Sequence, residues 1–389
     1  MRILVVGNYY PEHGGGIEFV CSELCREYEA LGHEVRWAAA DVSTSPHRGD
    51  AHAVPLTAWN LTEDHLGFPY PILAPSCLPA LGRAIAWSDV VHVHDCLYLS
   101  SALAVTLARR LGRPVLLTQH VVDVPYRAAA VRWMQRIAYR TLGRWVITRA
   151  DAVVTVSSPV AGRVGRLAGL RPSPRVIENG VNTQRFRMDG SPCREEMRAR
   201  LGVAAGTPLL LFVGRFVAKK GLHLVRGMAA ARPDWRWILI GRDGDVDPRR
   251  WAAPNVTVLG PLPQSDLPGY LRMADALVLP SVGEGFPLVV QEAMACGTSA
   301  VVLDGTAELD GEGRGLIHRS GAAVDELVRA TEDALVLAPD AEHRARVSRF
   351  AQERWGGSRA ALAYQDLLTD LTGRKAARRA APAPARRYR

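Results

Sequence analysis

The sequence predicts an α/β fold made of two doubly wound, Rossmann-like domains that face a cleft. Short apolar runs alternate with helical patterns along the chain, and this alternation stops at a polar stretch before it starts again. Strands that alternate with helices form parallel sheets with helices on both faces. At 389 residues the chain is also long enough for two domains of roughly 150–200 residues each.

The first domain is predicted over residues 1–183. Its strands are expected at residues 3–7, 34–40, 54–57, 90–94, 114–118, 152–156 and 175–177, and its helices at residues 17–31, 79–87, 97–111, 127–149 and 159–168. The strand runs are mostly apolar, as is typical of parallel strands that are buried on both faces. We therefore expect one covered parallel sheet in this half of the chain.

The polar residues 184–206 are interpreted as a linker region, and a second domain is predicted over residues 207–355. Its strands are expected at residues 209–213, 237–240, 256–259, 276–279 and 299–303, and its helices at residues 221–230, 265–273, 287–296, 322–337 and 341–354. One more helix is expected within residues 356–373. The restarted alternation predicts a second sheet with helices of its own.

Charge and composition exclude several classes of protein. The formal net charge is +9, but residues 374–389 hold seven Lys or Arg and no acid, so the rest of the chain carries only +2. We expect this basic tail to be disordered, and the near-neutral remainder disfavours a nucleic-acid-binding protein. No run reaches the ~20 apolar residues of a membrane span. Six cysteines without a CxxC pair, and no secretory signal, predict a cytoplasmic chain with reduced thiols.

The stretch from residue 279 to residue 300 contains the two glutamates of most interest. An apolar run ends at Leu279, a loop rich in Pro and Gly follows, and Pro287 is expected at the first position of the next helix. Glu284 lies in the loop and Glu292 lies within the helix. Loops at this edge of a parallel sheet bind ligands. Their spacing alone favours ordinary surface glutamates, since most exposed glutamates have no specific role.

Two further loops have a composition that suits a phosphate. After the first strand, Gly14, Gly15 and Gly16 lie at the start of a helix, where backbone N–H groups and the helix dipole favour an anion. The pattern is not GxGxxG, so a dinucleotide site is poorly supported. In the second half, Arg215 follows a strand and Lys220 precedes a helix, a pair that could neutralise a diphosphate. A turn without a ligand and two solvated cations are the alternatives.

Three histidines lie on or just after predicted strands in the first half. His92 and His94 alternate on one predicted strand, and His120 comes just after another. A third metal ligand at a recognisable spacing is missing, so we predict no metal site. His120 is the histidine that we favour as a site residue, and His94 ends its strand where it could face the cleft.

A basic stripe is predicted on the helix over residues 127–149. Four arginines spaced by four, with aromatic and apolar residues between them, would share one helix face: Arg132, Arg136, Arg140 and Arg144. A basic helix of this kind can lie on an anionic membrane surface, and the basic tail could add to the attraction. A solvated face that pairs with acids elsewhere is the alternative.

Taken together, these motifs resemble the retaining glycosyltransferases of the GT-B fold, the large group 1 family with an E-x7-E motif. The resemblance runs from Met1 to about Leu371. It rests on the first glycine loop, on IENGVN at 177–182 with Asn182 in place of the usual Asp, on GR…KG over 214–221, and on Glu284 and Glu292 followed by AMACG. These segments occur in the order and roughly the spacing of the family.

The resemblance implies a role for each matching residue. Arg215 and Lys220 would stabilise the departing diphosphate, together with N–H groups after Pro287. Glu292 would bind the ribose hydroxyls and Glu284 would face the donor sugar. His120 would lie near the reacting centre. The implied donor site also includes Gly15, Gly16, Phe286, Leu288 and Val289, and the acceptor side includes His94 and Glu18.

The resemblance also implies substrates and location. It implies transfer of a hexosyl unit from a UDP- or GDP-sugar to a cell-envelope, glycolipid, polysaccharide or secondary-metabolite acceptor, with no metal and no other cofactor. The last helix would cross back to the first domain. We expect a cytoplasmic enzyme that can also lie on the inner face of the cell membrane, with no nucleic-acid partner. A nucleotide-sugar epimerase of the same fold and a basic nucleic-acid-binding protein stay open as alternatives.

Overall fold

The chain forms two compact units in the computed structural model, which describes residues 1–42, 52–66, 70–122, 129–190, 192–284, 286–306, 309, 313 and 315–380. The first unit comprises Met1–His120, Met134–Ile177 and Ala360–Arg389, and the second comprises Val121–Trp133 and Glu178–Arg359. The chain therefore enters the second unit twice, at Val121 and at Glu178, and returns to the first at Met134 and at Ala360.

The first unit is built on an eight-stranded sheet in the order β4-β3-β2-β1-β5-β6-β7-β8. Only the pairing of β3 with β4 is antiparallel among these strands. The bounds are β1 (Arg2–Tyr9), β2 (Glu34–Asp41), β3 (Ala53–Trp59), β4 (Ile72–Leu73), β5 (Val90–His94), β6 (Val115–Gln119), β7 (Ala152–Thr155) and β8 (Arg175–Val176). The order reverses between β1 and β5, so the topological switch point of a doubly wound sheet lies there.

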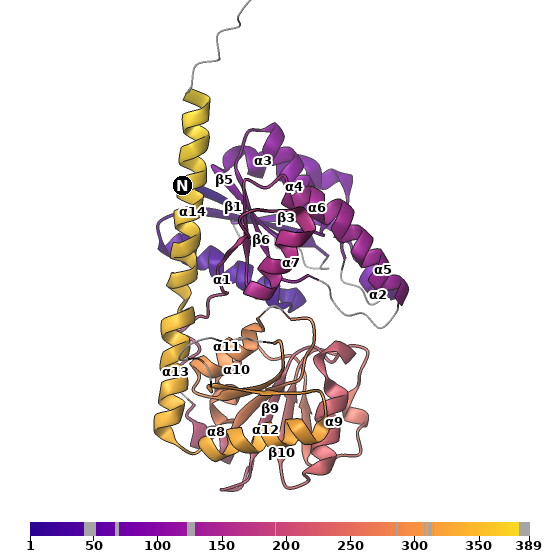
Figure 1. Ribbon diagram of the computed structural model, residues 1–389, viewed down its shortest axis with the longest axis vertical. Coiled ribbons are helices and arrows are strands. Elements are labelled where there is room, and N and C mark those ends of the chain that lie inside the picture. Colours follow the sequence, from indigo (N-terminus) through magenta and orange to yellow (C-terminus); the bar gives the residue numbers. More distant parts are fainter. Residues whose placement is uncertain are drawn as a thin grey trace, which may run out of the picture. The chain divides into compact units, whose positions relative to one another are not determined.

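Helices cover both faces of this sheet (Figure 1). On one face lie α1 (Gly16–Ala30) and α14 (Gly357–Ala380), whose Tyr28 and Tyr364 both contact His92 of β5. The other face carries α3 (Leu78–Trp87), α4 (Leu99–Arg110), α6 (Arg144–Ile147) and α7 (Ser158–Ala168). Right-handed crossovers require this division, because the connections on the two sides of the switch point run in opposite directions. A short helix, α2 (Leu61–Leu66), follows β3.

The long helix predicted over residues 127–149 is present over residues 129–147 but contains a π-helical segment, which corrects the arginine stripe. Residues 123–128 lie outside the described residues, and α5 (Ala129–Ala138) leads into a π-helical segment, Tyr139–Gly143, before α6. A π-helical turn inserts a residue and shifts every later side chain around the axis. Spacing by four therefore no longer keeps Arg144 in line with Arg136. Nη1 of Arg144 instead donates a hydrogen bond to the carbonyl of Leu167, at 3.0 Å.

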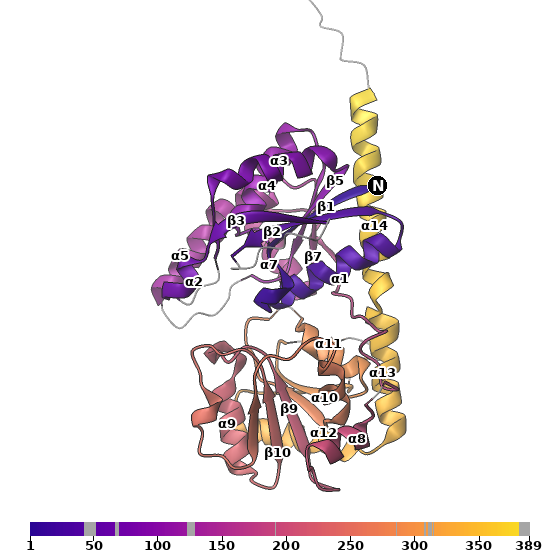
Figure 2. The ribbon, with the colours of Figure 1, turned by 180° about the vertical axis from the view of Figure 1, so that it is seen from behind.

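The second unit is built on a six-stranded parallel sheet in the order β11-β10-β9-β12-β13-β14 (Figure 2). The strands are β9 (Leu209–Val213), β10 (Arg236–Ile240), β11 (Val256–Leu259), β12 (Ala276–Leu279), β13 (Ser299–Leu303) and β14 (Ile317–Ser320). The last of these was not predicted. The order reverses between β9 and β12, which places the second switch point there.

The helices of the second unit form two groups. The first group is α9 (Leu222–Ala231) and α12 (Val324–Leu337), which pack together. The second group contains α8 (Arg194–Arg200), α10 (Leu267–Met273), α11 (Leu288–Ala295) and α13 (Ala341–Trp355). All four residues of β12 are fully buried between these layers, and burying one Val or Leu side chain stabilises a fold by about 1.5–3 kcal/mol.

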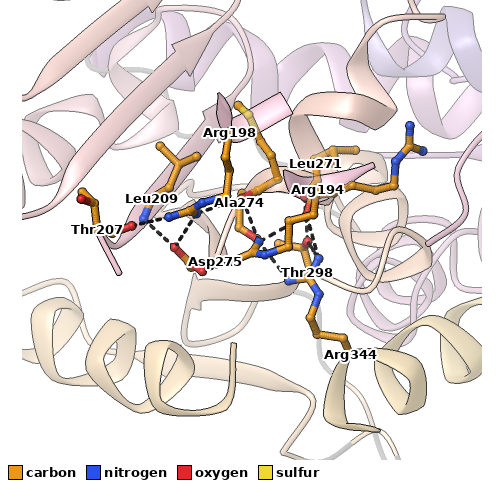
Figure 3. A network of polar contacts seen from close by, with 11 residues as sticks. Arg194, Arg198, Thr207, Leu209, Leu271, Ala274, Asp275, Thr298 and Arg344 are labelled. Carbon is orange, nitrogen blue, oxygen red and sulfur yellow. Dashed lines mark hydrogen bonds and ion pairs between the residues drawn. The ribbon is translucent and has the colours of Figure 1, made fainter. Parts of the chain in front are cut away.

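The residues predicted as a linker, 184–206, are part of the second unit (Figure 3). Arg194 and Arg198 of α8 both form ion pairs with Asp275, whose Oδ2 also accepts a hydrogen bond from the backbone of Leu209 at 2.7 Å. Arg194 and Arg344 donate to carbonyl groups at the end of α10, where helical carbonyls lack partners within the helix. The polar composition of α8 therefore reflects buried pairing and not an exposed connection.

Two other boundaries differ from the sequence prediction. Where the chain passes from the first unit into Glu178–Arg359 of the second, the boundary lies after Ile177 and not after residue 183, because Glu178 forms a bidentate ion pair with Arg354 of α13. The basic tail was predicted to be disordered from Arg374, but residues 374–380 continue α14, since Lys, Arg and Ala are good helix formers. Residues 381–389 lie outside the described residues. The predicted fold class, two Rossmann-like α/β domains, is confirmed.

Candidate functional site

The predicted site residues gather at the carboxyl ends of strands next to the two switch points. In the second unit, Arg215 follows β9, and Glu284 lies in the loop after β12. In the first unit, the glycine loop follows β1, His94 ends β5, and His120 follows β6. Open parallel sheets bind ligands at such positions, so each unit has one candidate region, and the two are described separately.

An ion pair forms the centre of the region in the second unit. Nζ of Lys220 lies 2.9 Å from Oε1 of Glu284, and each side chain is only 16% exposed. Lys220 ends a 3-10 turn, Ala218–Lys220, which leads into α9. Within the described residues, no hydrogen bond or ion pair engages the guanidinium of Arg215. The sequence prediction that these three residues share one edge of the sheet is supported by this geometry.

Electrostatics in this region favour a bound anion. Burial, the largest influence on the Glu284 carboxyl, opposes its charge, but Lys220, Lys219 and Arg215 outweigh burial and hold its pKa below the usual value. Burial is also the largest influence on Lys219 and lowers its pKa, with the neighbouring cations adding to the effect. Three cations therefore surround one carboxylate, which leaves an excess of positive charge. Lys219 was missed by the sequence analysis, although its place beside Lys220 could have suggested it.

A glycine permits the close approach of the two loops that form this region. Gly221 has φ +74°, and a Cβ there would lie 2.0 Å from the carbonyl oxygen of Pro280. The backbone N–H of Val282 donates to the carbonyl of Lys219 at 3.0 Å. Any side chain at Gly221 would therefore push the loop of Lys220 away from the loop that carries Glu284.

The helix α11 begins one residue later than predicted. Pro287 is its N-cap, with an extended backbone, and Leu288 is its first residue. No side chain caps this end of the helix, so its first N–H groups remain suited to an anion. Glu292 is 5% exposed within α11. Phe286 is buried and packs against Trp355, with ring centroids 5.2 Å apart, so its side chain belongs to the core.

In the first unit, the glycine loop leads directly into α1. Gly15 is the N-cap of the helix and Gly16 its first residue. The carboxylate of Glu18 folds back over the loop, since a Cβ on Gly15 would lie 2.0 Å from its Oε2. A Cβ on Gly16 would meet no atom within 4 Å. The open side of this loop is therefore at Gly16, while Glu18 occupies the space beside Gly15.

Three histidines of the first unit, His92, His94 and His120, are buried together. Nδ1 of His94 lies 2.9 Å from Nε2 of His120, and the rings of His92 and His94 lie 4.3 Å apart between centroids. Burial lowers the pKa of His92 to about 3, with a further contribution from His120, and lowers the pKa of His120 to about 4. Burial also lowers the pKa of His94 well below its usual value. All three imidazoles are therefore neutral at neutral pH.

A carboxyl group next to the histidines is also perturbed. Burial raises the pKa of Asp95 to about 6, against hydrogen bonds from Gln119 and from the backbone of Cys96. Asp95 has φ +67°, in the left-handed region that non-glycine residues rarely adopt. Its Oδ1 accepts a hydrogen bond from Nε2 of Gln119, on the neighbouring strand, at 2.6 Å.

A second polar cluster of the first unit was not predicted. His13, in the glycine loop, stacks on the ring of Tyr9 with centroids 3.8 Å apart, and its Nε2 lies 2.9 Å from Oε2 of Glu63. Asn60 donates to Glu63 at 2.7 Å and accepts from the hydroxyl of Tyr9 at 2.8 Å. Glu63 and Asn60 follow β3, a part of the chain where the sequence showed no motif.

The described residues hold neither a metal-type cluster of side chains nor a membrane-spanning helix. Across these ranges, no three His, Cys, Asp or Glu side chains are grouped as a metal site would require. Over the same part of the chain, no helix combines the length and the hydropathy that spanning a membrane would need.

Two family models match this chain. Glycosyltransferase Family 4 matches residues 14–185, which covers the glycine loop and the histidines. Glycosyl transferases group 1 matches residues 207–336, which covers Arg215, Lys220 and both glutamates. The two matches follow each other in the order of the two units.

Individual proteins give the same result. The chain is 30% identical to D-inositol 3-phosphate glycosyltransferase of Xylanimonas cellulosilytica over 320 residues, 76% of this chain and 75% of that protein. It is 28% identical to the GDP-mannose:cellobiosyl-diphosphopolyprenol alpha-mannosyltransferase of Xanthomonas oryzae pv. oryzae over 325 residues, 78% and 79% of the two chains. The crystal structure of Anabaena HepE in complex with UDP and glucose covers 95% of this chain and 100% of that one, with a TM-score of 0.73 and 18% identity. This last likeness shows the shared fold.

Proposed function

This chain belongs to the group 1 glycosyltransferases and is a glycosyltransferase enzyme, and we propose that it moves a hexosyl unit from a UDP- or GDP-sugar with retention of configuration and without a metal. The observation that carries this proposal is the ion pair of Lys220 with Glu284, with Arg215 beside it at the switch point of the second unit. A relative whose name includes GDP-mannose, and a structural neighbour crystallised with UDP, support a nucleotide-sugar donor.

The charges of the second unit suit departure of a diphosphate. When the bond between the anomeric carbon and the diphosphate breaks, negative charge develops on oxygen, and fixed cations stabilise it without reorganising. Arg215 and Lys220 are assigned this role, together with the first N–H groups of α11. Because the guanidinium of Arg215 has no hydrogen-bond or ion-pair partner within the described residues, it can bind the diphosphate without breaking an existing ion pair.

The remaining roles concern the sugars. Glu292 is assigned to the ribose hydroxyls and Glu284 to the donor sugar, which becomes oxocarbenium-like as the leaving group departs. The first unit is assigned to the acceptor, with His120 acting near the reacting centre and the open backbone at Gly16 near the donor phosphates. The acceptor is proposed to be a cell-envelope, glycolipid, polysaccharide or secondary-metabolite molecule.

Transfer assays with matched variants test the proposal. The purified full-length chain would first be screened with UDP- and GDP-sugars by thermal shift, because a ligand that binds only the folded state raises the melting temperature. Product formation would then be measured at saturating donor for the wild type and for Arg215→Ala and Glu292→Ala. We expect both variants to lose transfer. Transfer at the wild-type rate in both would overturn the assignment.

An epimerase of the same fold is the second candidate, and its reaction distinguishes it. An epimerase converts a UDP-sugar when no acceptor is present, whereas a transferase consumes donor in proportion to the acceptor supplied. Both matching family models are transferases. Conversion of the sugar without acceptor would favour the epimerase.

We also propose that α5 brings the enzyme to an anionic membrane surface. Trp133 is 65% exposed, Met134 57% and Ile137 40%, and Arg136 is exposed on the same helix. Exposed apolar side chains next to cations suit a lipid interface. Cosedimentation with vesicles containing phosphatidylglycerol should fall for Trp133→Ser and not for Val336→Ser, a matched change of an exposed apolar residue on α12. Equal binding of both variants would exclude α5 as the contact.

A further inference from the structure

His94 and His120 form a buried imidazole pair at the carboxyl ends of β5 and β6. The nitrogens Nδ1 of His94 and Nε2 of His120 lie 2.9 Å apart, and the ring planes differ by 21°. His94 is fully buried and His120 is 4% exposed. Since β5 borders the switch point of the first unit and β6 is its neighbour, the pair lies at the edge where a parallel sheet binds its ligands.

Only one hydrogen atom can lie between these two nitrogens. Burial keeps both imidazoles neutral at neutral pH, and a neutral imidazole has one N–H donor and one acceptor nitrogen. Either His120 donates from Nε2 to His94, or His94 donates from Nδ1 to His120. In the first arrangement His120 carries its hydrogen on Nε2. In the second, Nε2 of His120 is the acceptor and its hydrogen is on Nδ1.

The other nitrogen of His94 decides between these arrangements. Its Nε2 is buried and has no hydrogen-bond partner in the described part of the chain. If His120 were the donor, His94 would carry its hydrogen on Nε2 and bury an N–H group with no acceptor, at a cost of about 1–3 kcal/mol. Among backbone groups, orphaned buried N–H groups are rarer than under-satisfied carbonyl acceptors, and we extend this preference to the imidazole nitrogen. The arrangement in which His94 donates avoids the orphaned N–H group.

We propose that His94 is a positioning residue that selects the tautomer of His120, so that His120 presents its Nδ1–H as a hydrogen-bond donor to an oxygen of the substrate. The inference rests on the proposed function in one respect, the assignment of His120 to the reacting centre. It deepens that function, because a neutral Nδ1–H donor suits a sugar hydroxyl or an oxygen that gains negative charge. His120 is then a donor and not a general base.

The surrounding residues support His94 without competing for its Nδ1. The ring of His92 packs at a tilt against that of His94. Both nitrogens of His92 are engaged, Nδ1 with the hydroxyl of Tyr28 at 3.1 Å and Nε2 with Oγ1 of Thr118 at 2.8 Å. The carboxyl of Asp95 is bound to Gln119. An acid is therefore not what orients His94, and the tautomer follows from the pair itself.

Nitrogen-detected NMR tests the tautomer directly. The full-length chain would be labelled with 15N-histidine, and the His120 signals would be assigned by comparison with His120→Gln. At neutral pH we expect the hydrogen of His120 on Nδ1, with an acceptor-type shift for Nε2. A hydrogen on Nε2 of His120 in the wild type would overturn the proposal. This measurement needs no sugar transfer, so it gives an answer even if the proposed function fails.

Kinetics of three variants test the consequence. His94→Phe keeps an aromatic ring but removes the donor. We expect kcat to fall roughly 10–100-fold, by analogy with the loss of partners that orient metal-binding imidazoles, with the donor KM little changed. His94→Asn places an amide N–H near the position of Nδ1 and should recover part of the rate. Tyr364→Phe, which removes a nearby hydrogen bond to Thr118, is the control and should keep kcat.

The outcomes separate positioning from general damage. Thermal unfolding of each variant reports whether it folds, and the wild-type tautomer remains a test if His94→Phe does not. Recovery by His94→Asn together with an intact Tyr364→Phe supports the proposal. Wild-type kcat in a folded His94→Phe, or an equal loss in Tyr364→Phe, would overturn it.

Discussion

The two units have the same kind of sheet but opposite chemistry at their switch points. In the second unit, Lys219, Lys220 and Arg215 surround the carboxylate of Glu284, and charge dominates. In the first unit, His94 and His120 are buried and neutral, and directional hydrogen bonds dominate. The fold provides the edge where ligands bind, while the side chains decide whether that edge attracts an anion or aligns a neutral hydroxyl.

The difference also appears in how each unit uses charge for stability. The second unit buries Asp275 among arginines that connect α8, α10 and α13, whereas the polar network beneath the histidines of the first unit is built from the hydroxyls of Tyr28, Thr118 and Tyr364. Removing one partner from a buried ionic network costs more than removing a neutral hydroxyl. Changes in the ionic network of the second unit should therefore have larger effects than changes in the neutral network of the first.

The largest effect is expected from Asp275→Ala. This change leaves Arg194 and Arg198 without their carboxylate and the backbone N–H of Leu209 without its acceptor. The free energy of unfolding should fall by about 3–5 kcal/mol, measured by urea denaturation. Asp325→Ala, which breaks an exposed pair with Arg329, is the control and should change it little. Similar losses in both variants would show that the buried network does not hold the second unit together.

Changes at the charged switch point should act on rate. Arg215→Ala and Lys220→Ala should each lower kcat roughly 10²–10³-fold, the range found when one preorganised group that stabilises a developing charge is removed. Initial rates at saturating donor measure this loss. Arg226→Ala removes an exposed cation from α9 and should keep the rate. If Arg226→Ala slows the enzyme as much as Arg215→Ala does, net charge and not position would be responsible.

The neutral histidines predict a dependence of stability on pH in the first unit. Because His92 and His120 have lowered pKa values of about 3 and about 4, the unfolded chain binds more protons below its ordinary histidine pKa of about 6.5. Stability is therefore complete above that pH and falls as the pH drops toward 4, by about 1.4 kcal/mol per pH unit for each histidine. The pKa of Asp95 is raised to about 6, so its effect on stability has the opposite sign. As the pH rises toward 6, the stability lost through Asp95 offsets the stability gained through one histidine.

Hydrogen exchange can compare the two units as the pH falls. Because the pKa of Glu284 is lowered in the folded chain, its contribution to folding stability is fully present above the unfolded-state pKa of about 4.3 and is lost only at lower pH. Between about pH 7 and about pH 5, amides of β5 and β6 should therefore lose protection while those of β9 and β12 keep it. Equal loss in both sheets, after correction for intrinsic exchange rates, would contradict the contrast.

The smallest effect is expected from Tyr364→Phe. It removes the hydroxyl that lies 3.2 Å from Oγ1 of Thr118 but keeps the ring that packs on His92. The free energy of unfolding should fall by only about 0.5–1.5 kcal/mol, the net contribution of a typical hydrogen bond. Thermal and urea unfolding measure this. A loss as large as that of Asp275→Ala would show that neutral and ionic networks matter equally here.

The sequence predicted some parts of the site better than others. Glu284, Arg215 and Lys220 were expected at one edge because each lies just after a strand or before a helix in a repeating pattern. The interruption of the arginine helix at Tyr139–Gly143 could not be predicted, because the spacing by four suited an unbroken helix. The cluster of His13 with Glu63 also escaped prediction, since Asn60 and Glu63 become neighbours of the glycine loop only when β3 joins the sheet.

By itself, the sequence determined the two parallel sheets, their order along the chain and the loops that carry the chemistry, because apolar periodicity and glycine placement are local properties. Only the tertiary structure decided that α8 belongs to the second unit, through Arg194 and Asp275, which are 81 residues apart. It also decided that His94 binds His120, which is 26 residues away. Neighbouring strands are distant in sequence, so pairings between their ends, and the burial that keeps the histidines neutral, arise only when the sheet forms.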